Sequence, residues 1–80
     1  MVQQTESSKI TIRKHDNTTF NVTCDLKDGV EALKRKINIE QNIPIDKQAL
    51  ILDGQRLDNS RSLIDYGIVG GYELDLFIKI

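Results

Sequence analysis

The chain is 80 residues long, with 39% hydrophobic residues, 29% charged residues and a formal net charge of -1. This length allows one small domain with a single core. The near-neutral charge offers no basic surface of the kind that binds nucleic acids or anionic membranes, so we expect neither as a partner. No apolar stretch approaches the roughly 20 residues that a membrane span needs.

The single cysteine and the single histidine limit the chemistry further. One cysteine, Cys24, cannot form an internal disulfide, and one histidine, His15, cannot build a Cys/His zinc cluster. A free thiol fits the reducing cytoplasm or nucleus, where we expect the protein to act. The sequence also has no Gly-rich phosphate loop. We therefore expect no catalytic residue, no metal and no cofactor.

The first third of the chain predicts a leader and a hairpin. Residues 1–8 are polar and lack periodicity, which predicts a flexible leader ahead of a domain at 9–80. Apolar and polar residues then alternate on both sides of turn-forming residues at 16–18, which predicts an antiparallel hairpin over 9–25. Its buried face would carry Ile10, Ile12, Phe20, Val22 and Cys24.

The next segment changes to helical spacing. Val30, Leu33 and Ile37 fall on one face of a helix, which predicts that this face packs against the sheet. Three basic residues at 34–36 fall mostly on other faces, so we expect them to be chiefly solvated.

The ends of this helix also carry sequence signals. Asp28 and Glu31 have the spacing of a capping box, which predicts an acidic N-terminal cap. Asn42 suits a C-terminal cap, and Pro44 cannot continue a helix. We therefore expect the helix over 30–41.

The second half predicts a strand pair and a final strand. A short apolar strand at 48–52 meets a tight turn at Asp53-Gly54, and residues 55–57 return the chain. An irregular segment at 58–71 leads to a last strand at 73–80, which we expect to be central because it is the most apolar. This order of elements predicts an α+β roll, in which one helix covers one face of a mixed sheet of four to five strands.

An ordered set of residues between 43 and 68 follows a known pattern. The pattern has Ile-Pro after a helix, a Gln-x-Leu-Ile strand, a Gly turn and a Leu-x-Asp-Tyr turn before the last strand. Its positions are filled here by Ile43, Pro44, Asp46, Gln48, Leu50, Ile51, Gly54, Leu57, Arg61, Leu63, Asp65, Tyr66 and Ile68. In this order and spacing the chain resembles the ubiquitin family, over essentially all of 9–80. The resemblance implies a ubiquitin-like β-grasp fold.

Alternation in two strands predicts an apolar patch on the outer face of the sheet. If Leu50 and Leu52 point inward, Ile51 points outward, and the same argument turns Phe77 outward. Isolated apolar residues are normal on protein surfaces. Two of them on adjacent strands, however, form the beginning of a binding patch.

The resemblance assigns a role to these residues. Ile51 stands where the family's main recognition surface has its central Ile, Phe77 replaces a Val of that surface, and His15 replaces a Leu. The rim of the surface would include Gly54, Gln55, Arg56, Ala49 and Asp75. Because Ala49 replaces an Arg, Gln55 a Lys and Asp75 a His, we expect acidic partners to be attracted less than in the family's prototype. A second patch would comprise Ile43, Ile78 and Ile80, unless these residues belong to the core.

The end of the sequence decides between two uses of the fold. Conjugated members of the family end in a flexible tail with Gly-Gly, whereas this sequence ends at Ile80, and Gly70-Gly71 precedes the last strand. We therefore expect a non-catalytic, monomeric interaction module of a larger protein. It would dock proteasome subunits, ubiquitin-binding domains or chaperone-related factors. The alternatives are a modifier whose tail follows Ile80 and a purely structural or solubilising domain.

Overall fold

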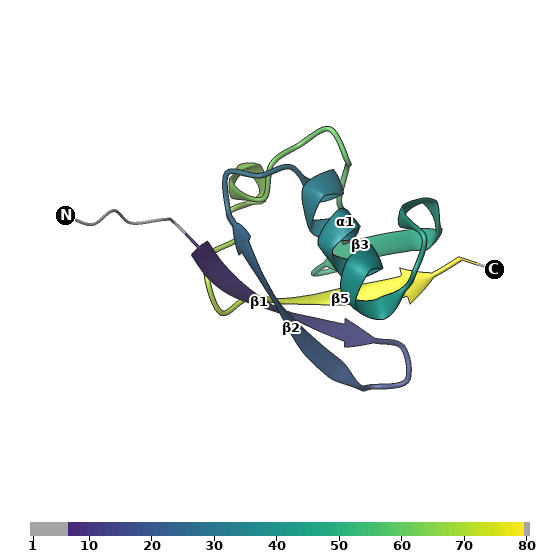
Figure 1. Ribbon diagram of the computed structural model, residues 1–80. Coiled ribbons are helices and arrows are strands. Elements are labelled where there is room, and N and C mark those ends of the chain that lie inside the picture. The colour runs from purple at the N-terminus through teal and green to yellow at the C-terminus, as the bar shows by residue number, and fades with distance from the viewer. Residues whose placement is uncertain (1–6, 80) are drawn as a thin grey trace.

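A five-stranded mixed sheet with one main helix on one face forms the fold (Figure 1). The computed structural model describes residues 7–79. In chain order its elements are β1 (Ser7–Lys14), β2 (Thr19–Asp25), α1 (Val30–Gln41), the 3-10 helix η1 (Ile45–Lys47), β3 (Gln48–Leu52), β4 (Gln55–Arg56), the 3-10 helix η2 (Ile64–Tyr66) and β5 (Glu73–Ile78). The strand order is β2-β1-β5-β3-β4; β1 and β5 pair in parallel, and the other three pairs are antiparallel. The α+β roll of β-grasp type predicted from the sequence is confirmed.

The first hairpin begins earlier than predicted. Strand β1 starts at Ser7, and Ser7 and Ser8 pair with Asp25 and Cys24 at the end of β2. The leader therefore does not extend through residue 8, because the long β2 supplies pairing partners for two more residues of β1. Residues 1–6, the rest of the predicted leader, lie outside the described residues.

The helix has the predicted bounds, and its C-terminus ends as expected. Asn42 adopts the left-handed conformation, with φ 59° and ψ 41°, and its backbone N–H donates to the carbonyl of Asn38 at 2.8 Å. Asn tolerates this conformation better than most residues, which is why it serves as a cap here.

The predicted capping box at the start of the helix is wrong. The N-terminal cap is Gly29, and no side chain caps the first turn. Instead, the backbone N–H of Val30 donates to the carbonyl of Arg61 at 2.8 Å, and Gly29 forms an isolated bridge with Ser62. The free N–H groups of a helix start need acceptors from some source. Here a distant loop, not a local carboxylate, supplies one of them.

The core lies between α1 and the inner face of the sheet. Strand β5 runs in the middle, as predicted, and its inward residues Leu74 and Leu76 are fully buried. The irregular segment after β4 closes the core with Leu63 and Ile68. The hydroxyl of Tyr66, which needed a partner, accepts the backbone N–H of Asp58 at 2.8 Å. No helix of the described residues has the length and apolarity that crossing a bilayer requires.

Two adjacent residues of β5 test the assignment of the two sheet faces. Leu76 is fully buried, so we expect Leu76→Ala to lower the free energy of unfolding by about 2–5 kcal/mol. Phe77 points to the other face and is half exposed, so Phe77→Ala should cost about 1 kcal/mol or less. Urea denaturation measures both values, and equal losses for the two variants would contradict the assignment.

Candidate interaction surface

Pairing between β3 and β5 places the predicted patch residues on one face. In the antiparallel register, Ala49 lies opposite Phe77 and Ile51 lies opposite Asp75. Residues directly opposite one another share a face, and so do residues two apart along a strand. Ile51 and Phe77 are therefore diagonal neighbours on the outer face, which is the face turned away from α1.

The exposure of the patch residues is unequal. Phe77 is 52% exposed, whereas Ile51 is only partly exposed and Ala49 is buried at 9%. Ala49, expected at the rim of the patch, lies directly opposite Phe77 and offers little accessible surface. We call Ala49, Ile51 and Phe77 the outer apolar patch. Phe77 provides most of its accessible surface.

A basic residue that sequence reasoning missed lies beside this patch. Strand β1 runs parallel to β5 and places Arg13 opposite Asp75. The Arg13 Nε lies 3.1 Å from the Glu73 carboxylate and 3.3 Å from the Asp75 carboxylate. These exposed ion pairs contribute little to stability. Arg13 shares its single positive charge between the two carboxylates, so this cluster keeps a net single negative charge and still repels acidic partners.

The remaining predicted rim residues lie at two ends of the outer face. His15 and Phe77 line a hollow of about 430 Å³ next to the first hairpin turn. On the other side, Arg56 pairs with Ile51 across β3 and β4, and the exposed Gly54 and Gln55 belong to the turn and to β4. The turn forms as predicted, and Gly54 has a positive φ of 81°. The fold thus brings these predicted rim residues around the outer apolar patch.

The described residues of the predicted second patch, Ile43 and Ile78, belong to the core or pack against it. Ile43 is buried and belongs to the core, and Ile78 packs against the core while partly buried. Ile80 lies outside the described residues. The side-chain amides of Asn38 and Gln48 donate to the carbonyl of Ile43 at 2.8 and 3.0 Å. These bonds hold the segment after the helix against the core, so the alternative of core membership applies to Ile43 and Ile78.

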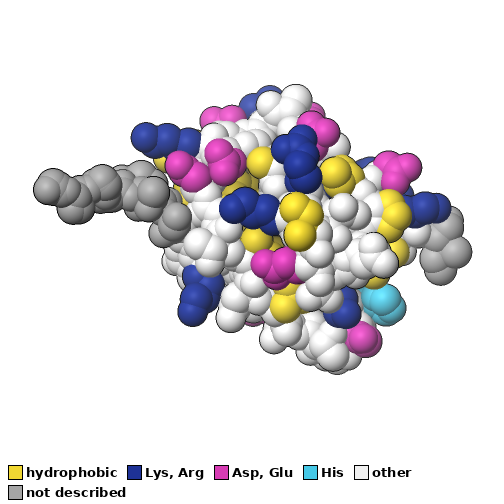
Figure 2. Space-filling view, in the orientation of Figure 1, with side chains coloured by type: hydrophobic (Ala, Val, Ile, Leu, Met, Phe, Trp, Pro, Cys, Tyr) yellow, Lys and Arg dark blue, Asp and Glu magenta, His cyan; other side chains and the backbone are white. Residues whose placement is uncertain are grey.

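The helix side of the molecule has a mixed surface in the view that shows it. In Figure 1, α1 lies in front of the sheet. Figure 2, in the same orientation, shows acidic and basic side chains interspersed with small, separate apolar areas. Ile39, on α1, is 77% exposed. Such isolated apolar residues are common on protein surfaces.

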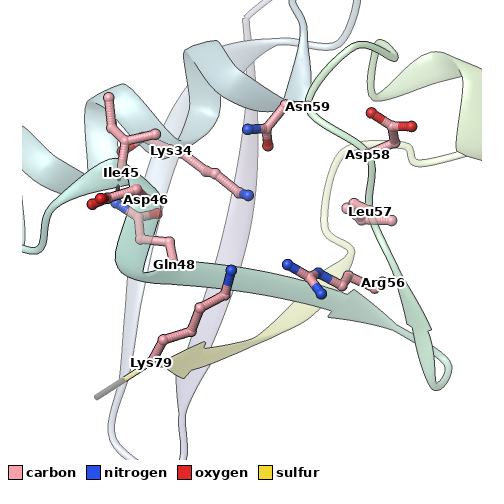
Figure 3. A pocket seen from close by; sticks show the side chains of 9 residues that line it. All are labelled: Lys34, Ile45, Asp46, Gln48, Arg56, Leu57, Asp58, Asn59 and Lys79. Atoms are coloured by element: carbon pink, nitrogen blue, oxygen red, sulfur yellow. Dashed lines mark hydrogen bonds between the residues drawn. The ribbon is translucent and has the colours of Figure 1, made fainter.

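A second hollow, of about 530 Å³, lies between α1, β3 and β4 (Figure 3). Lys34 of α1 lines it and is only 5% exposed, so the prediction that this residue is solvated is wrong. Residues four apart share one side of a helix, and Lys34 follows the buried Val30 by four. Its long aliphatic stem allows it to occupy a largely apolar position.

The charge of Lys34 is poorly compensated at this position. Burial lowers the pKa of the Lys34 ammonium, and repulsion from Arg56 and Lys79 lowers it further, while Glu31 and Asp58 oppose the shift. Among the ion pairs of residues 7–79, none involves Lys34.

Gln48 fixes the floor of the same hollow. This side chain is 1% exposed, and its Nε2 donates to the carbonyls of Lys34 and Ile43 at 2.9 and 3.0 Å. Its Oε1 has no hydrogen-bond partner within the described part of the chain. Gln48 thereby ties β3 to Lys34 in the helix and to Ile43 in the segment after the helix.

Comparison with known proteins agrees with this geometry. The model described as "Ubiquitin family" matches residues 10–80. The chain belongs to the ubiquitin family. The match confirms the resemblance that residues 43–68 carry in the sequence.

Three Arabidopsis thaliana proteins are among the relatives of this ubiquitin-family chain. It is 37% identical over 60 residues to "Ubiquitin domain-containing protein 7SL RNA2", 32% over 59 residues to "Ubiquitin domain-containing protein DSK2a", and 27% over 71 residues to "Ubiquitin domain-containing protein DSK2b". These matches cover 75%, 74% and 89% of this chain, but only 23%, 11% and 13% of the relatives. The similarity therefore concerns one domain-sized part of each relative.

The single thiol of this ubiquitin-family domain is buried. Burial raises the pKa of the Cys24 thiol, which makes it a poor nucleophile. Between residues 7 and 79, no three His, Cys, Asp or Glu side chains gather where they could hold a metal ion. An apolar centre with a charged rim is, by contrast, a common composition of protein interfaces.

Lys34 offers a test of the buried charge. We expect Lys34→Met to raise the free energy of unfolding by about 1 kcal/mol, because Met keeps an aliphatic stem without the poorly compensated charge. Arg35→Met is the matched control, since Arg35 is exposed on the same helix and Met has a similar helix propensity. Urea denaturation at neutral pH measures both, and a destabilised Lys34→Met variant would contradict the assignment.

The pH dependence of stability provides a second readout. Because the pKa of Lys34 is lower in the folded chain than its ordinary value of 10.5, the folded state loses this proton first as the pH rises. The unfolded state then binds more protons, so the stability of the wild type relative to Lys34→Met should increase between the lowered pKa and 10.5. A difference that stays constant across this window would show that the pKa is not lowered.

Proposed function

We propose that this ubiquitin-family domain is a non-catalytic protein-interaction module that binds its partners through the outer apolar patch. The observation that carries the proposal is the common outer face of Ile51 and Phe77 on paired strands. Within residues 7–79, the helix lies on the other face of the sheet, so the patch is left for another molecule.

The relatives support a partner class. Their printed names describe ubiquitin domain-containing proteins, and the matched region forms a small part of each. This favours a docking role inside longer proteins, with partners from the ubiquitin system: ubiquitin-binding domains, proteasome subunits or chaperone-related factors. Because the patch is small and Phe77 supplies most of its surface, we expect a transient interface of micromolar affinity.

Amide shift mapping with ubiquitin-binding domains tests the proposal. Partner binding should shift the amides of β3 and β5 around Ile51 and Phe77. We expect Ile51→Ala to weaken binding about tenfold, because truncating a central interface residue commonly costs more than 1 kcal/mol.

A matched control is available on the helix. Ile39→Ala makes the same chemical change at a more exposed position on α1, away from the outer face, and should leave the affinity unchanged. Equal affinities for Ile51→Ala and the wild type would exclude the outer apolar patch as the binding site.

A further inference from the structure

Three basic side chains from separate elements converge on the hollow beside α1. Lys34 comes from α1, Arg56 from β4, and Lys79 follows β5. Figure 3 shows both amines and the guanidinium pointing into the same space. We call this space the basic hollow. Its lining residues are Lys34, Ile45, Asp46, Gln48, Arg56, Leu57, Asp58, Asn59 and Lys79.

The carboxylates of the basic hollow form no ion pair with these cations among the described residues. Asp58 is engaged elsewhere, since its Oδ1 accepts the backbone N–H and the hydroxyl of Ser60, each at 2.9 Å. In Figure 3, the carboxylates of Asp46 and Asp58 point to the margins of the space. Among the described residues, the ion pairs of the chain involve none of the three cations.

This arrangement is electrostatically costly in the free domain. Arg56 and Lys79 both lie close enough to Lys34 to repel its ammonium, which is also desolvated. An anion placed between like charges reduces the repulsion between them. Three cations against two carboxylates leave a net single positive charge on the walls, so a group with one negative charge suits the space best.

Arg56 links the basic hollow to the outer apolar patch, since it lines the hollow and pairs with Ile51. Arg56 lies directly opposite Ile51 in the pairing of β3 and β4, so a molecule that covers Ile51 also reaches Arg56. We propose that the basic hollow binds the carboxylate of an Asp or Glu side chain of the same partner protein that covers the outer apolar patch. This inference rests on the proposed function.

The inference also changes the expected charge preference. Ala49, Gln55 and Asp75 suggested that acidic partners are attracted less. The structure shows positive charge concentrated at another place, where Lys34, Arg56 and Lys79 meet. A partner would therefore carry its acidic residue toward β4 and the end of β5.

The first experiment uses acetate as the probe. The isotope-labelled 80-residue chain is titrated with sodium acetate in place of sodium chloride at constant ionic strength. The side-chain signals of Lys34 and the amide of Asn59 report on the basic hollow. We expect these signals to shift, and the Asn59 shift to fall at least about threefold in Arg56→Gln and in Lys34→Met.

Lys27→Gln serves as the control for this titration, because Lys27 is exposed and does not line the basic hollow. Its shifts with acetate should match those of the wild type. Shifts that are absent, or that are the same in Arg56→Gln and Lys34→Met as in the wild type, would overturn the anion site.

The second experiment uses the ubiquitin-binding domain that shows binding in the shift mapping. We expect Arg56→Gln to weaken its affinity about tenfold, with a smaller loss at higher salt, while Lys27→Gln has no effect. If acetate binds but Arg56→Gln leaves the partner affinity unchanged, the basic hollow takes only free anions and the proposal fails.

The two proposals fail in different ways. If Ile51→Ala has no effect while Arg56→Gln weakens the partner, the outer apolar patch is excluded, and with it the claim that one partner covers both places; only carboxylate binding at the basic hollow is retained. If Ile51→Ala weakens the partner while Arg56→Gln has no effect, the patch stands and the carboxylate site is overturned.

Discussion

Strand β5 is held in register on both sides, and the remaining structure depends on this double pairing. It runs parallel to β1 and antiparallel to β3, so its alternate side chains face the helix and the outer surface. The inward Leu74 and Leu76 complete the core. The outward Asp75 and Phe77 take their places beside Arg13 and Ala49. A shift of one residue in this register would expose the leucines and bury a carboxylate, which makes the register strongly specified.

The junction between α1 and β3 is the second structural constraint, and it is polar. Gln48 uses its amide to hold the carbonyls of Lys34 and Ile43, so the chain leaving the helix returns directly into the sheet. The same junction buries Lys34 next to Arg56 and Lys79 without an ion pair among the described residues. Buried polar groups without full compensation lower stability. A local loss of stability of this kind is often found at binding sites. It therefore marks the basic hollow as a candidate site on an otherwise mixed surface.

Two features of the outer face together describe the partner. The outer apolar patch is small and relies mainly on Phe77, so it can supply only part of a specific interface. The neighbouring Arg56 extends that face toward a positively charged space. A partner that combines an apolar anchor with a nearby carboxylate would use both, and charge placement of this kind contributes to specificity more than to affinity.

Local patterns in the sequence determined the elements and the direction of most side chains. The alternation around Ile51 and Phe77, the helical spacing of Val30, Leu33 and Ile37, and the Asn42 and Asp53-Gly54 signals each depend on a few neighbouring residues. These local preferences agreed with the final fold, and the order and spacing of the pattern residues at 43–68 indicated the family. Periodicity depends on residues close together in the chain, so it can be recognised in the sequence without knowledge of the fold.

Tertiary structure decided the features that depend on residues far apart in the chain. Arg61 replaced the predicted acidic cap at the start of α1, because its carbonyl reaches Val30 only once the loop folds back. The parallel pairing of β1 with β5 brought Arg13 to Asp75, and the antiparallel pairing of β3 with β5 placed Ala49 opposite Phe77. Lys34 met Arg56 and Lys79 in the same way, from three separate elements. Burial and electrostatic environment are set by which elements pack together, and no local pattern in the sequence carries that information.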